Sequence, residues 1–176
     1  MLIAILALAC LACVPLIGGH YGPLSKIHLR GGWLVTGALA VQIMIISVFD
    51  LRSEALARSL HVSTYLLIGV VIALNWSLQW LPVIAVGWLC NFIAIVANAG
   101  IMPTSSSAAR TIGRHVSGQF ENSTPTANAH LAFLGDNIAT PRNWPMANIL
   151  SVGDVVLLIG FALVIWTASR PTTRPI

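Results

Sequence analysis

Five stretches of this sequence are long, apolar and almost free of charged side chains. They cover residues 1–19, 32–49, 62–78, 81–100 and 149–168. An α-helix needs about 20 predominantly apolar residues to cross the hydrocarbon core of a bilayer. A helix also pairs its own backbone polar groups, as lipid requires. The sequence therefore predicts five transmembrane helices.

The composition agrees with a membrane environment. Charged residues make up 8% of the 176 residues, hydrophobic residues 57%, and the mean hydropathy is +0.86. A soluble domain has about 25% charged residues, so this chain has too few to cover a surface in water. The net charge of +4 is spread over the connections, without a basic run or the interleaved aromatic residues of a nucleic-acid surface. We expect the lipid bilayer as a partner and no nucleic acid.

The first apolar stretch has the length of a secretory signal peptide, but no basic residue precedes it. We therefore expect a retained helix. Within it, Cys10 and Cys13 form a C-x-x-C pair, but no second pair completes a zinc site. We expect these cysteines, like Cys90, to pack between helices.

The connection from residue 101 to 148 is rich in Ser, Thr, Asn and Pro and holds more than a quarter of the chain. Helical spacing predicts short amphipathic helices over 105–116 and 126–139. The stretches 62–78 and 81–100 are joined by a short turn, which predicts an antiparallel hairpin with Pro82 in the first turn of the second helix. The predicted fold is a single all-α membrane bundle of five helices over residues 1–176, with a long, partly helical loop.

Charge predicts how such a bundle is oriented. Five crossings place the termini on opposite sides, and all five acidic residues fall on or just inside the N-terminal side. The other side has no acidic residue, and its basic residues are Lys26, Arg30, Arg170 and Arg174. The N-terminal side has five basic residues, but Arg110 and Arg114 lie far from a helix end. By the positive-inside rule, we expect a cytoplasmic C-terminus, with the N-terminus and the long connection outside the cell membrane.

Asp154 is the most informative residue of the chain, because it lies inside the last apolar stretch. At about 1.5 Å per residue it sits roughly 8 Å below the membrane surface. A carboxyl group at that depth faces protein or a wet cavity, has a partner, or is protonated. Ser151 shares its helix face. The alternative is an aspartate stabilised by the positive end of the helix dipole.

Asn91 and Asn98 are seven residues apart and therefore share one helix face. They either form hydrogen bonds between helices or line a polar cavity. Asp136 and Asp50 fall on the same side of the membrane as Asp154. We expect Asp50, Asn98, Asp136 and Asp154 to converge on one polar pocket there. Asn91 and Ser151 are further candidates for binding residues.

The histidines on that side are His61, His115 and His130, and no ligand spacing joins them. We therefore predict solvated or interfacial histidines and assign no metal site; a metal or a haem-like pigment held by these histidines is the alternative. The sequence indicates no particular cofactor.

Three motifs carry a resemblance to a known family. They are Asn98-Ala-Gly-Ile-Met-Pro103, Leu134-Gly-Asp136 and Ser151-Val-Gly-Asp154. Together they resemble a family of bacterial multi-pass membrane proteins known only as a domain of unknown function. The resemblance runs from the third apolar stretch onward. It implies a bacterial inner-membrane protein and supplies no activity.

A second resemblance is to the layout of lipoprotein signal peptidase (signal peptidase II), a small helical membrane protease with two catalytic aspartates. Asp136 and Asp154 stand at a comparable separation, and Asp154 also opens the last helix. The resemblance implies that the two carboxyl groups share a proton and activate water. Ser151 and Gly153 replace the Asn and Ala of that family, and its Gly-Asn-x-x-Asp-Arg motif is absent.

Three classes of function remain open. The leading hypothesis is a non-catalytic accessory, assembly or binding subunit, packed against other membrane subunits or a second copy of the chain, because Gly- and Ala-rich helices suit close packing. The second is an intramembrane hydrolase using Asp136 and Asp154. The third is a small transporter using Asn91, Asn98 and Asp154, although the chain lacks the duplicated halves typical of transporters.

Overall fold

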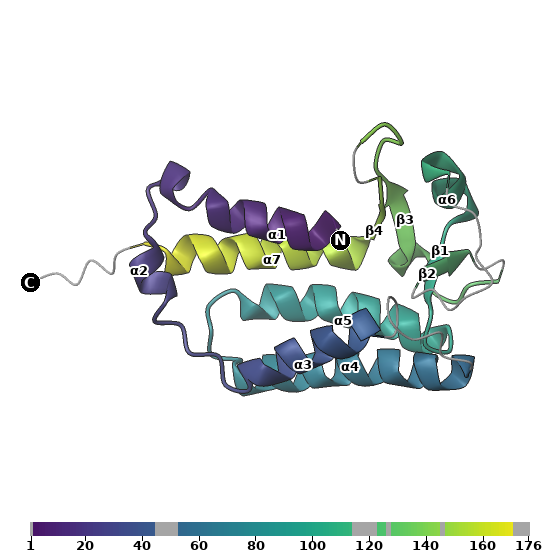
Figure 1. The fold of residues 1–176 in the computed structure, drawn as a ribbon, viewed down its shortest axis with the longest axis horizontal. Coiled ribbons are helices and arrows are strands. Elements are labelled where there is room, and N and C mark those ends of the chain that lie inside the picture. The colour runs from purple at the N-terminus through teal and green to yellow at the C-terminus, as the bar shows by residue number, and fades with distance from the viewer. Residues whose placement is uncertain (1, 45–52, 114–122, 126–127, 145–146, 171–176) are drawn as a thin grey trace, which may run out of the picture.

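The long helices of the computed structural model lie side by side along its long axis, and a small sheet closes one end (Figure 1). The structure describes residues 2–44, 53–113, 123–125, 128–144 and 147–170. The long helices are α1 (Leu2–Ala12), α3 (Gly32–Ile43), α4 (Glu54–Leu74), α5 (Leu81–Ala97) and α7 (Val152–Ala168). The short ones are α2 (Tyr21–Leu24), α6 (Ser106–Ile112) and the 3-10 helices η1 (Pro15–Ile17) and η3 (Ala132–Leu134).

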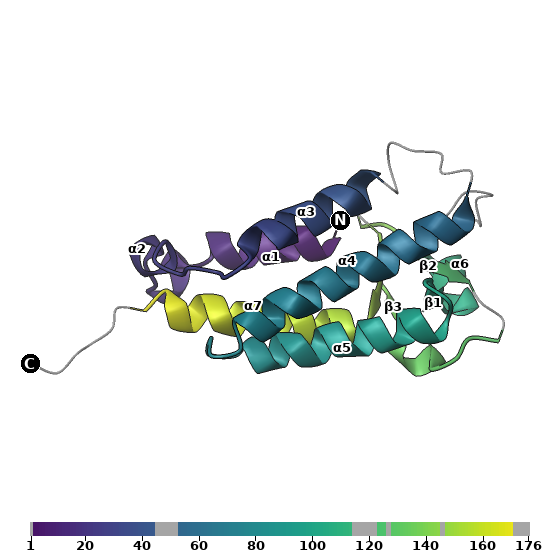
Figure 2. The ribbon, with the colours of Figure 1, turned by 90° about the horizontal axis from the view of Figure 1, so that it is seen from below.

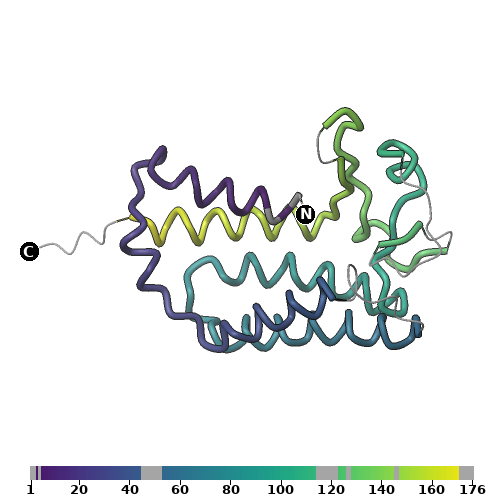
Figure 3. The backbone as a smooth tube through the Cα atoms, in the orientation of Figure 1, coloured from purple at the N-terminus to yellow at the C-terminus, as the bar shows by residue number. Residues whose placement is uncertain are grey.

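The sheet has four short strands in the order β2-β1-β3-β4. The strands are β1 (Met102–Thr104), β2 (Ser123–Pro125), β3 (Asp136–Ala139) and β4 (Ile149–Ser151). Strand β1 runs parallel to β2 and β3, whereas β3 and β4 are antiparallel. The four strands lie at the end of the molecule where α7 begins, alongside the start of α4 and the end of α5 (Figure 3).

The prediction of an all-α bundle with five membrane spans was therefore wrong. The long connection holds a mixed sheet, whose strands of three or four residues are too short to show an alternating apolar pattern. Within the described residues, one helix, α4 with 21 residues, is by itself long and apolar enough to cross a membrane. Helices α3, α5 and α7 are apolar but shorter.

The first apolar stretch, 1–19, is broken rather than one helix. Helix α1 ends at Ala12, and the 3-10 turn η1 begins at Pro15. Proline lacks an N–H and its ring clashes with the preceding helical turn. Gly18 then takes a φ of +73°, which ends the helical run. The second stretch gives α3, and residues 45–49 of that prediction lie outside the described residues.

The predicted hairpin of the third and fourth stretches is confirmed. Helices α4 and α5 pack against each other, and Pro82 lies in the first turn of α5. The boundaries differ from 62–78 and 81–100. Helix α4 begins eight residues earlier, at Glu54, because the Ser53 side chain accepts a hydrogen bond from the Leu56 N–H and caps it.

In the long connection, α6 lies within the helix predicted for 105–116, while the helix predicted for 126–139 was wrong. There the chain forms η3 and then strand β3. Leu131 takes a φ of +52°, and Gly135 is extended, so the apolar spacing is not carried by a helix. The last stretch, 149–168, is helical only from Val152, because Ile149–Ser151 pairs with β3.

Helices α5 and α7 form the most extensive helix contact, and they lie side by side in both views (Figure 2). Glycines make this contact close. A Cβ at Gly87 would lie 2.7 Å from the carbonyl oxygen of Gly153, and one at Gly160 would lie 2.8 Å from the backbone nitrogen of Ile84. The two backbones therefore touch at two levels, and one end of this contact meets the sheet.

Candidate polar site between the last helix and the sheet

A buried polar cluster joins α5 to the start of α7. It consists of Asn91, Ser151 and Asp154, which are 2%, 0% and 8% exposed. Asn91 Nδ2 donates to Asp154 Oδ1 at 2.7 Å, and Ser151 Oγ donates to Asn91 Oδ1 at 2.8 Å. The amide of Asn91 therefore pairs at both ends with residues of the last helix.

Ser151 and Asp154 also form a capping box, which closes the first turn of α7. The Asp154 N–H donates to Ser151 Oγ at 2.9 Å, and the Ser151 N–H donates to Asp154 Oδ2 at 3.0 Å. Two free N–H groups of the helix start are thus paired. Each Asp154 carboxyl oxygen therefore accepts a hydrogen bond, Oδ2 from the Ser151 N–H and Oδ1 from Asn91 Nδ2.

The close approach of the two helices depends on Gly153. A Cβ on Gly153 would lie 2.0 Å from Asn91 Oδ1. The Ser-Val-Gly-Asp sequence therefore combines a cap residue, a residue small enough to admit the Asn91 amide, and the carboxylate that this amide binds.

Asp136 lies beside this cluster, at the start of β3. It pairs across the antiparallel ladder with Ser151, and its side chain is buried. Ser123 Oγ donates to Asp136 Oδ2, and the hydroxyl of Ser123 is also hydrogen-bonded to that of Thr104. The Ser105 N–H donates to the Asp136 carbonyl oxygen at 2.9 Å. The sheet thus places a second buried carboxyl group next to the residue that caps α7.

Tyr65, on α4, lies near this cluster. Its hydroxyl is close enough to the Asn91 side chain and to the Asp154 and Asp136 carboxyl groups to be influenced by all three. Its backbone carbonyl oxygen accepts a bond from Trp88 Nε1 at 3.0 Å, which holds α4 against α5. A side chain from a third helix therefore lies near the polar cluster.

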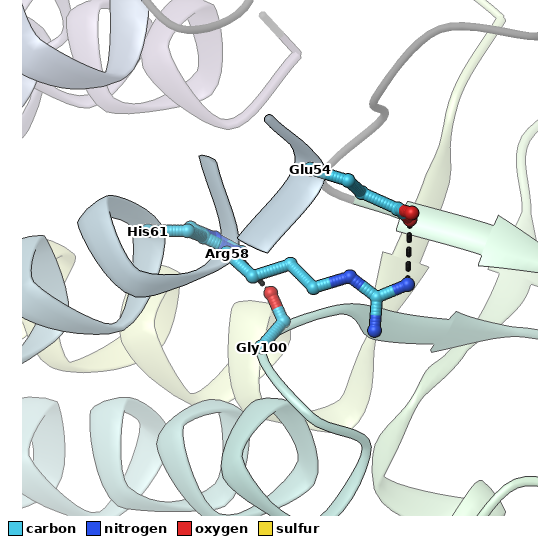
Figure 4. A network of polar contacts seen from close by, with 4 residues as sticks. All are labelled: Glu54, Arg58, His61 and Gly100. Carbon is cyan, nitrogen blue, oxygen red and sulfur yellow. Dashed lines mark hydrogen bonds and ion pairs between the residues drawn. The ribbon is translucent and has the colours of Figure 1, made fainter. Parts of the chain in front are cut away.

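One helical turn before Tyr65, His61 ties α4 to the turn between α5 and β1. Its Nδ1 lies 2.8 Å from the Gly100 carbonyl oxygen, so this nitrogen carries the donated hydrogen (Figure 4). The His61 and Tyr65 rings meet edge to face at 5.5 Å. Gly100 has a φ of +90°, and a Cβ there would lie 2.9 Å from the Cβ of Arg58.

The structure brings together four of the residues named from sequence: Asn91, Asp136, Ser151 and Asp154. Asn98 instead caps the end of α5. Its Nδ2 donates to the carbonyl oxygens of Ala94 and His130, and its Oδ1 accepts from the His130 N–H. Asp50 lies outside the described residues.

The three histidines that were expected to be solvated or interfacial differ in their surroundings. His61 is buried, contrary to the expectation of a solvated or interfacial residue. His130 is exposed, and His115 lies outside the described residues. In the part of the chain that the structure describes, no group of three or more His, Cys, Asp or Glu side chains could hold a metal ion.

Two residues of this region escaped the sequence reasoning. Tyr65 lies in an apolar stretch, and Ser123 is one of many hydroxyl residues in the long connection. The spacing of His61 and Tyr65, four residues apart in an apolar stretch, could have indicated a shared polar face. Nothing in the sequence pairs Ser123 with Asp136, since the contact depends on the strand order β2-β1-β3.

The fold and the cluster define a small protein of long apolar helices with a sheet at one end, where an Asn-Ser-Asp cluster lies beside a second buried aspartate. A family model matches residues 26–166, that of a family of unknown function (DUF5317), and the chain therefore belongs to this family. No curated protein and no solved structure matches the chain.

Proposed function

We propose that this chain is a multi-pass membrane protein that acts as a non-catalytic binding or assembly subunit. The observation that carries the proposal is the exposure of large apolar side chains on all five long helices. Examples are Leu8 on α1 (63% exposed), Trp33 on α3 (74%), Leu66 on α4, Val86 on α5 and Ile159 on α7. Apolar patches of this extent are covered by lipid or by a partner.

Helix lengths are consistent with insertion. Helix α4 has 21 residues and α5 and α7 have 17 each, which places the last two at the lower limit of about 17 residues for a span. We infer that α4, α5 and α7 cross the bilayer, with α1 and α3 packed against them. The glycine contacts between α5 and α7 match the small-residue packing that drives helix association in lipid.

Charge supports an orientation. Lys26 and Arg30 precede α3 and Arg170 follows α7, at the end opposite the sheet (Figure 1). The sheet end has three described basic residues as well, but two of them, Arg110 and Arg142, lie in the long connection, ten or more residues from a long helix. Giving more weight to basic residues next to a helix end, we infer from the positive-inside rule that the end opposite the sheet faces the cytoplasm. We infer that the sheet end then lies outside the cell membrane, and we propose that this membrane is a bacterial inner membrane.

The polar cluster fits a structural role better than a catalytic one. Asp154 and Asn91 use their polar atoms within the protein, in bonds that join two helices and cap one of them. A buried polar network with its members paired rigidifies the fold. A transporter that uses Asn91, Asn98 and Asp154 stays a prediction from sequence, and no contact of these residues favours it.

The binding surface that we propose is the outer face of α3. Trp33, Gly37, Ala40 and Met44 recur at spacings of four, three and four residues and are all exposed. A Cβ at Gly37 would meet no atom within 4 Å. The inner face is already occupied, since Gln42 Nε2 donates to Thr64 Oγ1 on α4 at 2.8 Å. Small residues on a lipid-facing helix admit the backbone of a partner helix.

Purification of the tagged full-length chain from native membranes in mild detergent tests this proposal. We expect a stable complex with another membrane subunit or a second copy. The change Gly37→Leu fills the open face without touching the rest of the protein and should dissociate the complex. The matched change Ala55→Leu, at an exposed small residue of α4, should leave it intact. A solitary monomer for the wild type, or equal behaviour of the two variants, contradicts the proposal.

One observation favours a second candidate, an aspartate-dyad hydrolase resembling signal peptidase II. Asp136 and Asp154 are both buried, Asp136 pairs with the residue that caps Asp154, and Tyr65 interacts with both. The test is hydrolysis of a fluorogenic lipid-modified peptide by the purified chain. Asp136→Asn and Asp154→Asn keep the side-chain shape and should each abolish hydrolysis. The candidate is rejected if the wild type is inactive or if either variant keeps full activity.

A further inference from the structure

An apolar groove of about 420 Å³ runs along the surface between α1 and α7. One wall comes from the end of α1 and from η1, the other from the second half of α7. The side chains that matter below are Cys10, Cys13, Ile17, Ile159, Leu163 and Trp166. The groove is open to the surface, so an apolar group can enter it from outside.

A cation stands at one end of this groove. The guanidinium carbon of Arg170 lies 4.6 Å from the ring centroid of Trp166, which lines the groove. This arrangement is a cation–π contact. It holds the exposed Arg170 next to the apolar wall instead of leaving it to extend into solvent.

Hydrogen bonds hold the chain that follows α1 against the end of α7. The His20 N–H donates to the Ser169 carbonyl oxygen at 2.8 Å, and Tyr21 Oη donates to the Leu11 carbonyl oxygen at 3.2 Å. A Cβ at Gly19 would lie 2.4 Å from Ser169 Oγ. The chain after α1 is thus fixed against the end of α7, beside Arg170.

Charge at this end of the molecule has one sign among the described residues. Its charged side chains are Lys26, Arg30 and Arg170, whereas the described acidic residues Glu54, Asp136 and Asp154 lie at or near the sheet end (Figure 1). A molecule bound in the groove would therefore contact apolar side chains along its length and positively charged side chains at one end. The ligand that fits such a groove has a long apolar tail and an anionic head.

We propose that the groove between α1 and α7 binds an anionic phospholipid, with an acyl chain along Cys10, Cys13, Leu163 and Trp166 and the phosphate at Arg170. This inference rests on the proposed membrane location. Arginine forms paired, charge-assisted hydrogen bonds with phosphate. A free phosphate ion leaves the apolar walls uncovered, and a zwitterionic lipid gains less from the surrounding positive charge.

A second groove of about 380 Å³, between α4 and α5, offers an internal comparison. It is lined by Gly69, Ala73, Trp76 and Trp88, among others, and is equally apolar. No cation–π contact of the described residues lies on its walls. We expect acyl chains there without a preference for the headgroup.

The test uses the full chain reconstituted in phosphatidylcholine vesicles that contain a small fraction of lipid brominated on its acyl chains. The brominated lipid is phosphatidylglycerol in one series and phosphatidylcholine in the other. Bromine quenches tryptophan fluorescence on contact, and the signal of Trp166 is the difference between the wild type and Trp166→Phe. We expect brominated phosphatidylglycerol to bind about fivefold better than brominated phosphatidylcholine, the effect of about one basic residue at the membrane surface.

Two pairs of variants locate the effect. Arg170→Gln should lower the ratio to about one, whereas Arg30→Gln, the same charge change at the same end of the molecule, should leave most of it. Ala162 lines the groove, so Ala162→Leu should remove the preference by filling the space. Ala73→Leu makes the same change in the other groove and should not.

The outcomes separate this inference from the membrane proposal. If neither brominated lipid quenches any tryptophan, the chain is not inserted and both fail. If both lipids quench Trp166 equally, or if Arg30→Gln abolishes the preference as fully as Arg170→Gln does, the chain is inserted but the groove is not an anionic-lipid site.

Discussion

Asn91 on α5 donates a hydrogen bond of 2.7 Å to the carboxylate of Asp154 at the start of α7. Both residues are more than nine-tenths buried. The contact lies at the sheet end, where α7 follows directly on β4. It therefore links the helix layer to the sheet, and a change at either residue should be felt in both.

Replacement of Asn91 by Leu should destabilise the protein by about 1–3 kcal/mol, because it leaves one oxygen of the buried Asp154 and the hydroxyl of Ser151 without their partner. Thermal unfolding of the full chain in detergent measures the change. Asn143→Leu, at an exposed position in the connection before β4, is the control and should stay within about 0.5 kcal/mol. Equal effects of the two variants would show that the Asn91 contact does not stabilise the fold.

The close glycine contact between α5 and α7 predicts that Gly→Ala changes affect stability differently at different positions. Gly160→Ala should destabilise by about 1–3 kcal/mol, because the new methyl group would lie 2.7 Å from Ile84 Cγ1 and 2.8 Å from its backbone nitrogen. Gly22→Ala makes the same change in α2, where no atom lies within 4 Å, and should not destabilise, because alanine favours helix. Denaturant unfolding of both variants gives the sign of each change, and a stabilising Gly160→Ala would contradict the close contact.

The positions of the main helices follow from apolar stretches, and four of the six candidate residues, Asn91, Asp136, Ser151 and Asp154, lie close together. The spacing Ser151-x-x-Asp154 is a capping-box pattern, so the start of α7 was open to prediction from local sequence. The contact with Asn91 was not, since it depends on how α5 and α7 cross. The sheet could not be predicted from the sequence for a different reason. Its strands have three or four residues, and Pro103 stands in β1, where proline is unusual.

The ion pair between Glu54 and Arg58 on α4 should contribute little to the free energy of unfolding. Their side chains lie 2.5 Å apart, one turn apart on the helix, but that of Glu54 is 62% exposed (Figure 4). Exposed pairs at this spacing contribute about 0.3–0.5 kcal/mol, and salt screens them. We expect Glu54→Gln to change the free energy of unfolding by no more than that, with the difference vanishing at high salt. A loss above about 1 kcal/mol would mean that Glu54 has a further partner.

Gly100, whose carbonyl oxygen accepts the His61 hydrogen bond, should not tolerate a side chain. Gly100→Ala adds two penalties. The residue has a φ of +90°, a conformation that costs a non-glycine residue about 1–2 kcal/mol, and its Cβ would lie 2.9 Å from the Cβ and 3.1 Å from the carbonyl oxygen of Arg58. The clash adds about 1–3 kcal/mol, since the neighbouring atoms belong to a helix backbone.

Gly18→Ala separates the two penalties of Gly100→Ala. Gly18 has a φ of +73°, but a Cβ there would meet no atom within 4 Å. Its variant should therefore show the cost of the backbone conformation alone, about 1–2 kcal/mol. Thermal unfolding of the two variants under one condition gives the comparison. If Gly100→Ala costs no more than Gly18→Ala, the turn after α5 can move away from α4, and the His61 bond does not hold the two together.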